Sequence, residues 1–262
     1  MEIYVAEVEG LREERVFGAM LEKVTEERRR SMEKCRRQED KIRGLGAGLL
    51  LEYGLNRLGL SLLAGNGYEQ VFLEYGENGK PYLRDREDIC FNLSHSGDYV
   101  AAVFASSAVG VDIEEIRQKG EKVARRFFRE EEQRYLAEGR WENCREQKFT
   151  ELWTRKESYI KAVGGGMKIP LHSFSVLGDR VISDFGDERQ KKSSWESGSE
   201  REKARADGEF FLRTYVMPEG YCLSVCGKVP VEAEPEMVSL VSLLCCDENH
   251  FGNDVHLGRD IV

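Results

Sequence analysis

The sequence VGVDIE, residues 109–114, constrains the fold of this chain more than any other stretch. Apolar and acidic residues alternate along it, which predicts a β-strand with one buried face. Side chains at i and i+2 point to the same face, so Asp112 and Glu114 lie side by side while Ile113 and the valines face a core. Neighbouring carboxylates repel unless a cation neutralises them. The stretch therefore predicts either a cation-binding pair, which suits Mg²⁺, or a solvated acidic edge that continues into Glu115.

A second stretch, WTRKESYIK at residues 153–161, has the pattern of a helix. Trp153, Glu157 and Lys161 recur at every fourth position and share one stripe of that helix. A glutamate four residues before a lysine is also an ordinary surface ion pair. The helix is apolar on its other side and ends at three glycines, residues 164–166, where backbone can approach a ligand closely. The spacing leaves both interpretations open.

The composition excludes several classes of protein. With 262 residues, 40% of them hydrophobic, the chain can bury a sizeable core. A net charge of -9 argues against a non-specific nucleic-acid binder. No apolar run is long enough to cross a membrane, and residues 1–7 do not resemble a secretory signal. The seven cysteines are scattered, which is typical of reduced thiols. We expect a cytoplasmic monomer that binds neither nucleic acid nor membrane.

Hydrophobic periodicity predicts an α+β protein with two similar lobes. Each half places helices before strands. The first half has a helix at 38–58 and strands at 89–93, 99–105 and 109–114. The second half has helices at 120–128, 129–139 and 143–163, and strands at 172–178, 209–217 and 221–227. The expected divisions are an N-terminal lobe over 1–115, a C-terminal lobe over 116–230 with a poorly ordered polar excursion at 186–208, and a C-terminal extension over 231–262 with a docked helix at 237–244.

Candidate phosphate ligands occur in two places. The sequence NLSHSG, residues 92–97, ends a strand, and Ser94 and His95 could bind phosphate through hydroxyl, imidazole and backbone N–H groups. A hairpin turn explains the same composition equally well. The helical segment 26–43 is rich in arginine, and one or two of its side chains could reach a phosphate monoester. The glycines at 44–48 lie in a helical pattern and do not form a dinucleotide fingerprint, and a P-loop sequence is absent.

Taken in order, these motifs resemble those of the 4'-phosphopantetheinyl transferases, specifically the long, two-lobed Sfp-type subgroup. VGVDIE and WTRKESYIK match that family's strand and helix motifs. GKP at 79–81 and FNLSHS at 91–96 match two further motifs, and EDKIR at 39–43 resembles a third. The resemblance covers about residues 1–230, and the excursion and the extension depart from it. It implies that the two α+β lobes lie in a pseudo-twofold arrangement. Four motifs in the right order and spacing make it specific.

The resemblance implies transfer of 4'-phosphopantetheine from coenzyme A to a serine of an apo acyl or peptidyl carrier protein, with release of 3',5'-ADP. It implies that Asp112, Glu114 and Glu157 hold Mg²⁺, or Mn²⁺ in its place, and that Glu157 and Lys161 are catalytic. Lys161 would bind the pyrophosphate and His95 the 3'-phosphate. The full set implied for coenzyme A is Arg28, Arg43, Lys80, Pro81, Ser94, His95, Asp112, Lys156 and Lys161, with Lys80 and Pro81 near the adenine.

This chemistry agrees with the residue types. Phosphoryl-type transfer depends on positioning and charge neutralisation more than on covalent catalysis. Glu157 is the candidate for removing the serine proton, directly or through a bound water. The alternatives are a non-catalytic module that binds coenzyme A or a carrier protein, and a different phosphotransferase acting on a nucleotide. The pairs Arg125-Arg126 and Phe127-Phe128 are candidates for carrier docking, although the phenylalanines also suit a core. The long form favours peptide- or polyketide-synthase carriers.

Overall fold

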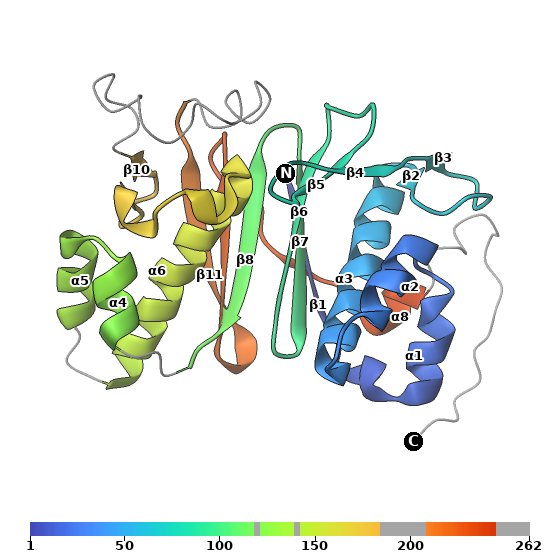
Figure 1. Ribbon diagram of the computed structural model, residues 1–262, viewed down its shortest axis with the longest axis horizontal. Coiled ribbons are helices and arrows are strands. Elements are labelled where there is room, and N and C mark those ends of the chain that lie inside the picture. Colours follow the sequence, from blue (N-terminus) through green and yellow to red (C-terminus); the bar gives the residue numbers. More distant parts are fainter. Residues whose placement is uncertain (118–120, 139–141, 184–207, 245–262) are drawn as a thin grey trace.

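The computed structural model describes residues 1–117, 121–138, 142–183 and 208–244. Two β-sheets lie face to face in the middle of the molecule, and helices cover the outer face of each (Figure 1). The first sheet has the strand order β13-β1-β7-β6, and the second has the order β11-β12-β8. Helix α3 packs on the first sheet, with α1 and α2 against it, and α6 packs on the second sheet, with α4 and α5 farther out (Figure 1). This arrangement confirms the predicted α+β class with two lobes.

The elements of the N-terminal lobe are β1 (Glu2–Glu7), a 3-10 helix (Glu9–Arg12), α1 (Glu14–Leu21), α2 (Glu26–Glu33), α3 (Gln38–Arg57), β2 (Leu60–Ser61), β3 (Glu69–Gln70), β4 (Leu73–Tyr75), β5 (Pro81–Leu83), β6 (Cys90–Ser96) and β7 (Tyr99–Ala105). The next elements are β8 (Val109–Glu115), α4 (Glu121–Phe127), α5 (Glu130–Ala137), α6 (Glu142–Val163), 3-10 helices (Gly166–Lys168 and Leu171–Ser173), β9 (Phe174–Ser175) and β10 (Ile182–Ser183). The chain continues with β11 (Phe211–Met217), a 3-10 helix (Pro218–Gly220), β12 (Tyr221–Gly227), β13 (Glu236–Met237) and α8 (Leu240–Leu244).

Strand pairing divides the lobes differently from the sequence prediction. The expected boundary followed residue 115, but β8 forms an antiparallel ladder with β12 and so belongs to the second sheet. The extension also returns to the N-terminal lobe, because β13 pairs in parallel with β1. Val238 and Leu243 are buried in the core of that lobe. Residues 184–207, which include nearly all of the polar excursion, and residues 245–262 lie outside the described residues.

A shared core joins the two sheets. Alternate apolar side chains of β8 point into it, as the strand pattern predicts, and Val109, Val111 and Ile113 are fully buried there. They meet residues of β1 and β7 from the first sheet and of β11 and β12 from the second. The even-numbered side chains of β8 therefore face the opposite way, toward α6. None of the described helices has the length and apolar character of a membrane span.

Helix α6 packs directly on β8 at Gly110. A Cβ atom at this position would lie 2.1 Å from the carbonyl oxygen of Ser158 and 2.4 Å from the backbone nitrogen of Ala162. These are backbone atoms of α6 and cannot rotate away. The glycine therefore sets the distance between the strand that carries Asp112 and the helix that carries Lys161. Gly46 of α3 plays a comparable part in the other lobe, where a Cβ would lie 2.3 Å from Val8.

A buried ion pair holds α6 against α5 and the segment that leads to β9. Lys156 and Glu132 have fully buried side chains, and their charged atoms are 2.9 Å apart. The Lys156 ammonium also donates to the carbonyl oxygens of Leu171 and Phe174 at 2.8 and 2.7 Å. The Glu132 carboxylate accepts from the backbone N–H of Val176 at 3.0 Å and caps the start of α5. Every charged group in this cluster thus has a partner.

We expect Gly110→Ala to lower the free energy of unfolding by about 1–3 kcal/mol or more, because the added methyl group must push α6 away from β8. The matched control is Gly18→Ala on α1, where an added Cβ meets no heavy atom within 4 Å. This control should be neutral or stabilising by about 0.5–1 kcal/mol, since alanine favours a helix over glycine. Urea unfolding measures both. Equal stability of the two variants would contradict the proposed contact.

Lys156→Met should destabilise the fold by about 3–5 kcal/mol, because it leaves the buried Glu132 charge uncompensated. The double variant Lys156→Met with Glu132→Gln should recover part of that loss, since the glutamine is neutral and still offers its carbonyl oxygen to one of the two backbone N–H groups. Urea unfolding of the wild type, both single variants and the double variant forms a double-mutant cycle. A double variant less stable than Lys156→Met would show that the two charges do not interact as described.

Candidate active site

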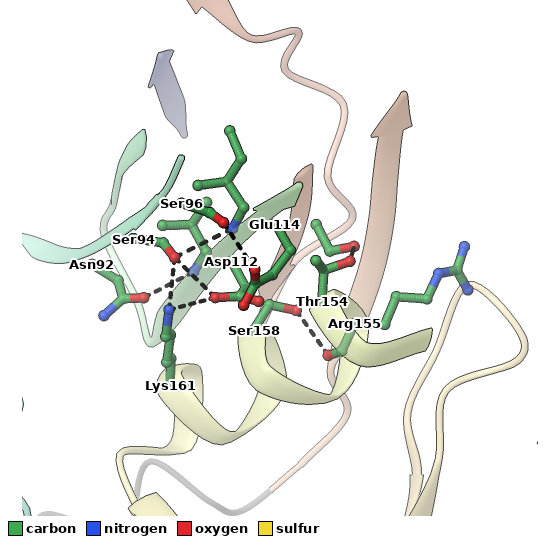
Figure 2. Close-up of polar contacts among 12 residues, drawn as sticks. Asn92, Ser94, Ser96, Asp112, Glu114, Thr154, Arg155, Ser158 and Lys161 are labelled. Atoms are coloured by element: carbon green, nitrogen blue, oxygen red, sulfur yellow. Dashed lines mark hydrogen bonds and ion pairs between the residues drawn. The ribbon is translucent and has the colours of Figure 1, made fainter. Parts of the chain in front are cut away.

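The candidate site lies where the two sheets meet, at the neighbouring strands β6 and β8. These strands belong to different sheets, and side chains of β6 rather than its backbone bind the backbone of β8 (Figure 2). The side-chain oxygens accept hydrogen bonds from alternate backbone N–H groups: Asn92 from Val111 at 2.9 Å, Ser94 from Ile113 at 3.3 Å and Ser96 from Glu115 at 3.2 Å. We call this set of three hydrogen bonds the seam. It fixes the register between the lobes.

The seam serines also bind the acidic side chains of β8. Ser94 donates to Asp112 Oδ1 at 2.9 Å, and Ser96 donates to Glu114 Oε2 at 2.9 Å. Lys161, which projects from α6, donates to Asp112 Oδ1 at 2.6 Å and to Ser94 Oγ at 2.9 Å (Figure 2). The structure therefore brings together four of the residues that the sequence predicts for the site.

Asp112 has one oxygen that the described residues leave without a partner. Its side chain is 7% exposed, and Oδ2 is buried with no hydrogen-bond partner within the described ranges. A buried carboxylate oxygen normally has at least one donor or cation. The Lys161 ammonium, on a side chain 28% exposed, contacts the other oxygen. The orphaned Oδ2 is the feature of this site that a cation would satisfy.

Glu157 lies one helical turn before Lys161 and lines a cavity of about 680 Å³ between the lobes. The cavity also contains Lys161 and apolar side chains. Its lining residues are Asn78, Gly79, Lys80, Pro81 and Asn92 from the N-terminal lobe, and Arg126, Phe127, Trp153, Glu157, Ile160, Lys161, Gly164, Gly166, Ile169, Pro170 and Leu171 from the C-terminal lobe. Among the residues described, the three acids do not form one close metal-binding cluster. Glu157 lines the cavity, whereas Asp112 and Glu114 accept hydrogen bonds from the seam serines.

A second cavity, of about 530 Å³, lies in the N-terminal lobe and is basic on one side. Its cationic lining residues are Lys23, Arg28, Arg30 and Lys34, from α2 and its flanks. Burial lowers the pKa of Arg28, although a guanidinium remains charged at neutral pH. The two cavities are neighbours, because Pro81 lines both and strand β6 contributes Leu93 to the basic one and Asn92 to the other.

His95 and Arg43 lie beside each other near the end of β6. The pKa of His95 is lowered, mainly because the surrounding protein removes water from the imidazole, and further by the cations Arg43 and Lys161. Arg43 is held by an ion pair to Asp40 at 2.5 Å and by a hydrogen bond to the carbonyl oxygen of Gly97 at 3.4 Å. At neutral pH His95 is therefore a neutral side chain beside a fixed cation.

Lys80 was predicted to lie near the adenine, but its ammonium binds backbone carbonyl oxygens of the protein. Its ammonium donates to the carbonyl oxygens of Val109, Lys161 and Ala162 at 3.0, 2.5 and 3.1 Å. Carbonyls in the last turn of a helix attract cations, so Lys80 binds the end of α6 to the N-terminal lobe. The structure thus assigns the side chain a joining role. Pro81, next to it, remains in the lining of both cavities.

Lys156 requires a correction. The sequence places it with the coenzyme A ligands, but its ammonium is buried in the ion pair with Glu132. The physical reason is its position on α6. Neighbours in a helix differ by about 100° in direction, so Lys156 points toward α5 while Glu157 lines the cavity. The structure therefore removes Lys156 from the candidate binding set.

Asn92 and Ser96 have a structural use that was not predicted from the sequence. Both belong to the NLSHSG segment, but only Ser94 and His95 were singled out there. A usable signal was present, because polar residues occupy the alternate positions 92, 94 and 96 and so share one face of the strand. The pattern does not identify the partner strand, because these side-chain oxygens accept hydrogen bonds from the backbone of a strand in the other sheet.

Comparison with known proteins identifies the family. The 4'-phosphopantetheinyl transferase superfamily matches residues 108–226, and the family "4'-phosphopantetheinyl transferase, N-terminal" matches residues 12–108. A 4'-phosphopantetheinyl transferase of Bacillus subtilis is 33% identical over 220 residues, 80% of this chain and 85% of its own length. The 4'-phosphopantetheinyl transferase gsp of Aneurinibacillus migulanus is 35% identical over 162 residues, 62% of this chain and 65% of its own length.

A third relative extends the likeness beyond bacteria. The L-aminoadipate-semialdehyde dehydrogenase-phosphopantetheinyl transferase of Xenopus laevis is 34% identical over 133 residues, 45% of this chain and 44% of its own length. The two family matches meet at residue 108, just before β8, where strand pairing also divides the lobes. They favour a transferase over a non-catalytic binding module. The matches and the two-lobed fold agree with the resemblance in the sequence, and the chain belongs to the 4'-phosphopantetheinyl transferase family.

Proposed function

We propose that this protein transfers the 4'-phosphopantetheine group of coenzyme A to a serine of an apo acyl or peptidyl carrier protein and releases 3',5'-ADP. The observation that carries the proposal is the contact of Lys161 with Asp112 and Ser94 at the seam, between a basic cavity and one with apolar walls. A pyrophosphate at this place meets an ammonium and a hydroxyl. The nucleotide then extends toward Arg28, and the pantetheine arm toward Trp153. We also propose that the protein acts as a monomer.

The donor set at the seam fits a hard divalent cation. Mg²⁺ is bound by oxygen ligands, usually one or two carboxylates together with substrate phosphates. Asp112 offers a buried oxygen without a partner, and Glu114 is the next side chain on the same face of β8. We propose that Asp112, Glu114 and Glu157 hold Mg²⁺, or Mn²⁺ in its place. When bound, the ion supplies positive charge to the pyrophosphate.

In the proposed reaction Glu157 accepts the proton of the carrier serine, directly or through a water molecule. The serine oxygen forms a bond to the phosphorus that carries pantetheine. The bond from that phosphorus to the bridging oxygen breaks, and this oxygen leaves with 3',5'-ADP. Lys161 compensates the negative charge on the phosphate groups through its ammonium. The position of Glu157 in the wall of the open cavity supports its role, because an incoming carrier serine must reach it.

The carrier protein would dock beside the apolar cavity. Phe128 is buried in the core of the C-terminal lobe and is therefore unsuited to docking. Phe127 and Arg126 line the cavity instead, so an acidic carrier surface could meet the arginine while its serine enters. Several curated relatives carry the names gsp, psf-1 and Sfp. We propose carriers of peptide or polyketide synthases as the partners.

Glu157→Gln should lower the rate of carrier loading by about a hundredfold or more, because the amide can neither accept the serine proton nor hold a cation as a carboxylate does. The measurement is the mass shift of apo carrier proteins incubated with coenzyme A and Mg²⁺, with release of 3',5'-ADP followed in parallel. The matched control is Glu146→Gln, on the same helix but outside the cavity lining. Loading by Glu157→Gln at the wild-type rate would refute the assigned role.

Coenzyme A should bind more tightly as the pH falls from about 8 to 6, because a bound 3'-phosphate stabilises the protonated form of His95. The sign follows from the lowered pKa of His95 in the free protein. The free ring is neutral at pH 7, and a phosphate raises its pKa, so binding takes up a proton and weakens as pH rises through the pKa in the complex. Calorimetric titrations at several pH values measure this slope. His95→Gln should flatten it, and an unchanged slope in that variant would contradict the contact.

A further inference from the structure

The direction of the Ser96 hydrogen bonds is fixed by its partners. The backbone nitrogen of Glu115 can only donate, so the Ser96 hydroxyl must accept from it. The single hydroxyl proton is then left for Glu114, whose Oε2 lies 2.9 Å away. Ser96 thus binds the backbone of one residue and the carboxylate of its neighbour at the same time. A methyl group in its place could do neither.

Ser94 has the same arrangement one step along the strand. It accepts from the backbone of Ile113 and from Lys161, both of which are donors, and gives its proton to Asp112. The Asp112 and Glu114 carboxylates are therefore each held through one oxygen by one β6 hydroxyl. The arrangement leaves Asp112 Oδ2 without a partner in the described structure, and Ser96 is the one hydrogen-bond partner shown for the Glu114 carboxylate.

Asn92 provides an internal comparison. It belongs to the same seam and accepts a hydrogen bond of similar length from the backbone of Val111. Val111, however, faces the buried core, and no carboxylate bond is shown for Asn92. Asn92 therefore joins the lobes without orienting an acid, whereas Ser96 does both.

We propose that Ser96 is a positioning residue that orients Glu114 for cation binding and makes the cation site dependent on the contact between the lobes. The inference rests on the metal site of the proposed function and deepens it. Hydrogen-bond partners of metal ligands fix the ligand's orientation, and their loss typically weakens metal binding by about 10–100-fold. Ser96 contacts Glu114 from the opposite lobe, so the two halves of the protein jointly define the site.

The test is a titration with Mn²⁺ of protein saturated with coenzyme A, in which free Mn²⁺ is measured by electron paramagnetic resonance. Ser96→Ala should weaken Mn²⁺ binding by about tenfold. Ser96→Thr, which keeps the hydroxyl, should bind within about twofold of the wild type. Asn92→Leu should lower the melting temperature as Ser96→Ala does, but should leave Mn²⁺ binding within about twofold. Should Ser96→Ala not fold, Ser96→Cys, with its weak donor, replaces it, and the same loss is expected.

The outcomes separate this inference from the proposed function. Asp112→Asn should abolish the Mn²⁺ binding that the wild type shows. A wild type that binds no more Mn²⁺ than coenzyme A alone would overturn the metal site itself. A wild type that binds, with Ser96→Ala or Ser96→Cys binding equally well, would overturn the role of Ser96 and leave the function standing. Equal weakening by Asn92→Leu would also overturn it, because the effect would then come from a loosened seam.

Discussion

The structure depends on how the backbone N–H groups of β8 are satisfied. One edge of this strand pairs with β12 in a regular antiparallel ladder. The other edge is buried against β6, and a buried N–H without a partner is unfavourable. Asn92, Ser94 and Ser96 provide the missing acceptors. Because side chains rather than backbone make these bonds, the two sheets can diverge while their edges stay in register, and the site forms where they meet.

Three lysines, Lys80, Lys156 and Lys161, have three different roles in the structure. Lys156 is fully buried and balanced by Glu132, so it stabilises the C-terminal lobe. Lys80 binds three carbonyl oxygens and attaches the end of α6 to the N-terminal lobe. Lys161 keeps partial access to solvent and contacts Asp112. Their charges are equal, and it is burial and the choice of partner that decide which of them can meet a phosphate.

The candidate site was predictable from sequence to the extent that it is local. The alternation in VGVDIE gave the face of Asp112 and Glu114 correctly, because a strand repeats every two residues. The spacing of four residues in WTRKESYIK placed Glu157 and Lys161 on one stripe of the helix, and both line the same cavity. Lys156 was misplaced because a motif match does not state which way each of its residues points. The use of Ser96 was missed because its partner lies in another sheet.

By itself the sequence determined the secondary structure around the motifs, the α+β class and the family, since periodicity and motif order are properties of the chain. Tertiary structure decided which strand joins which sheet: β8 leaves the lobe in which it was expected, and β13 returns to β1. It also decided that Asp112 keeps one buried oxygen without a partner. The physical reason is that hydrogen-bond satisfaction and burial depend on residues distant in sequence, which only the packed lobes bring into contact.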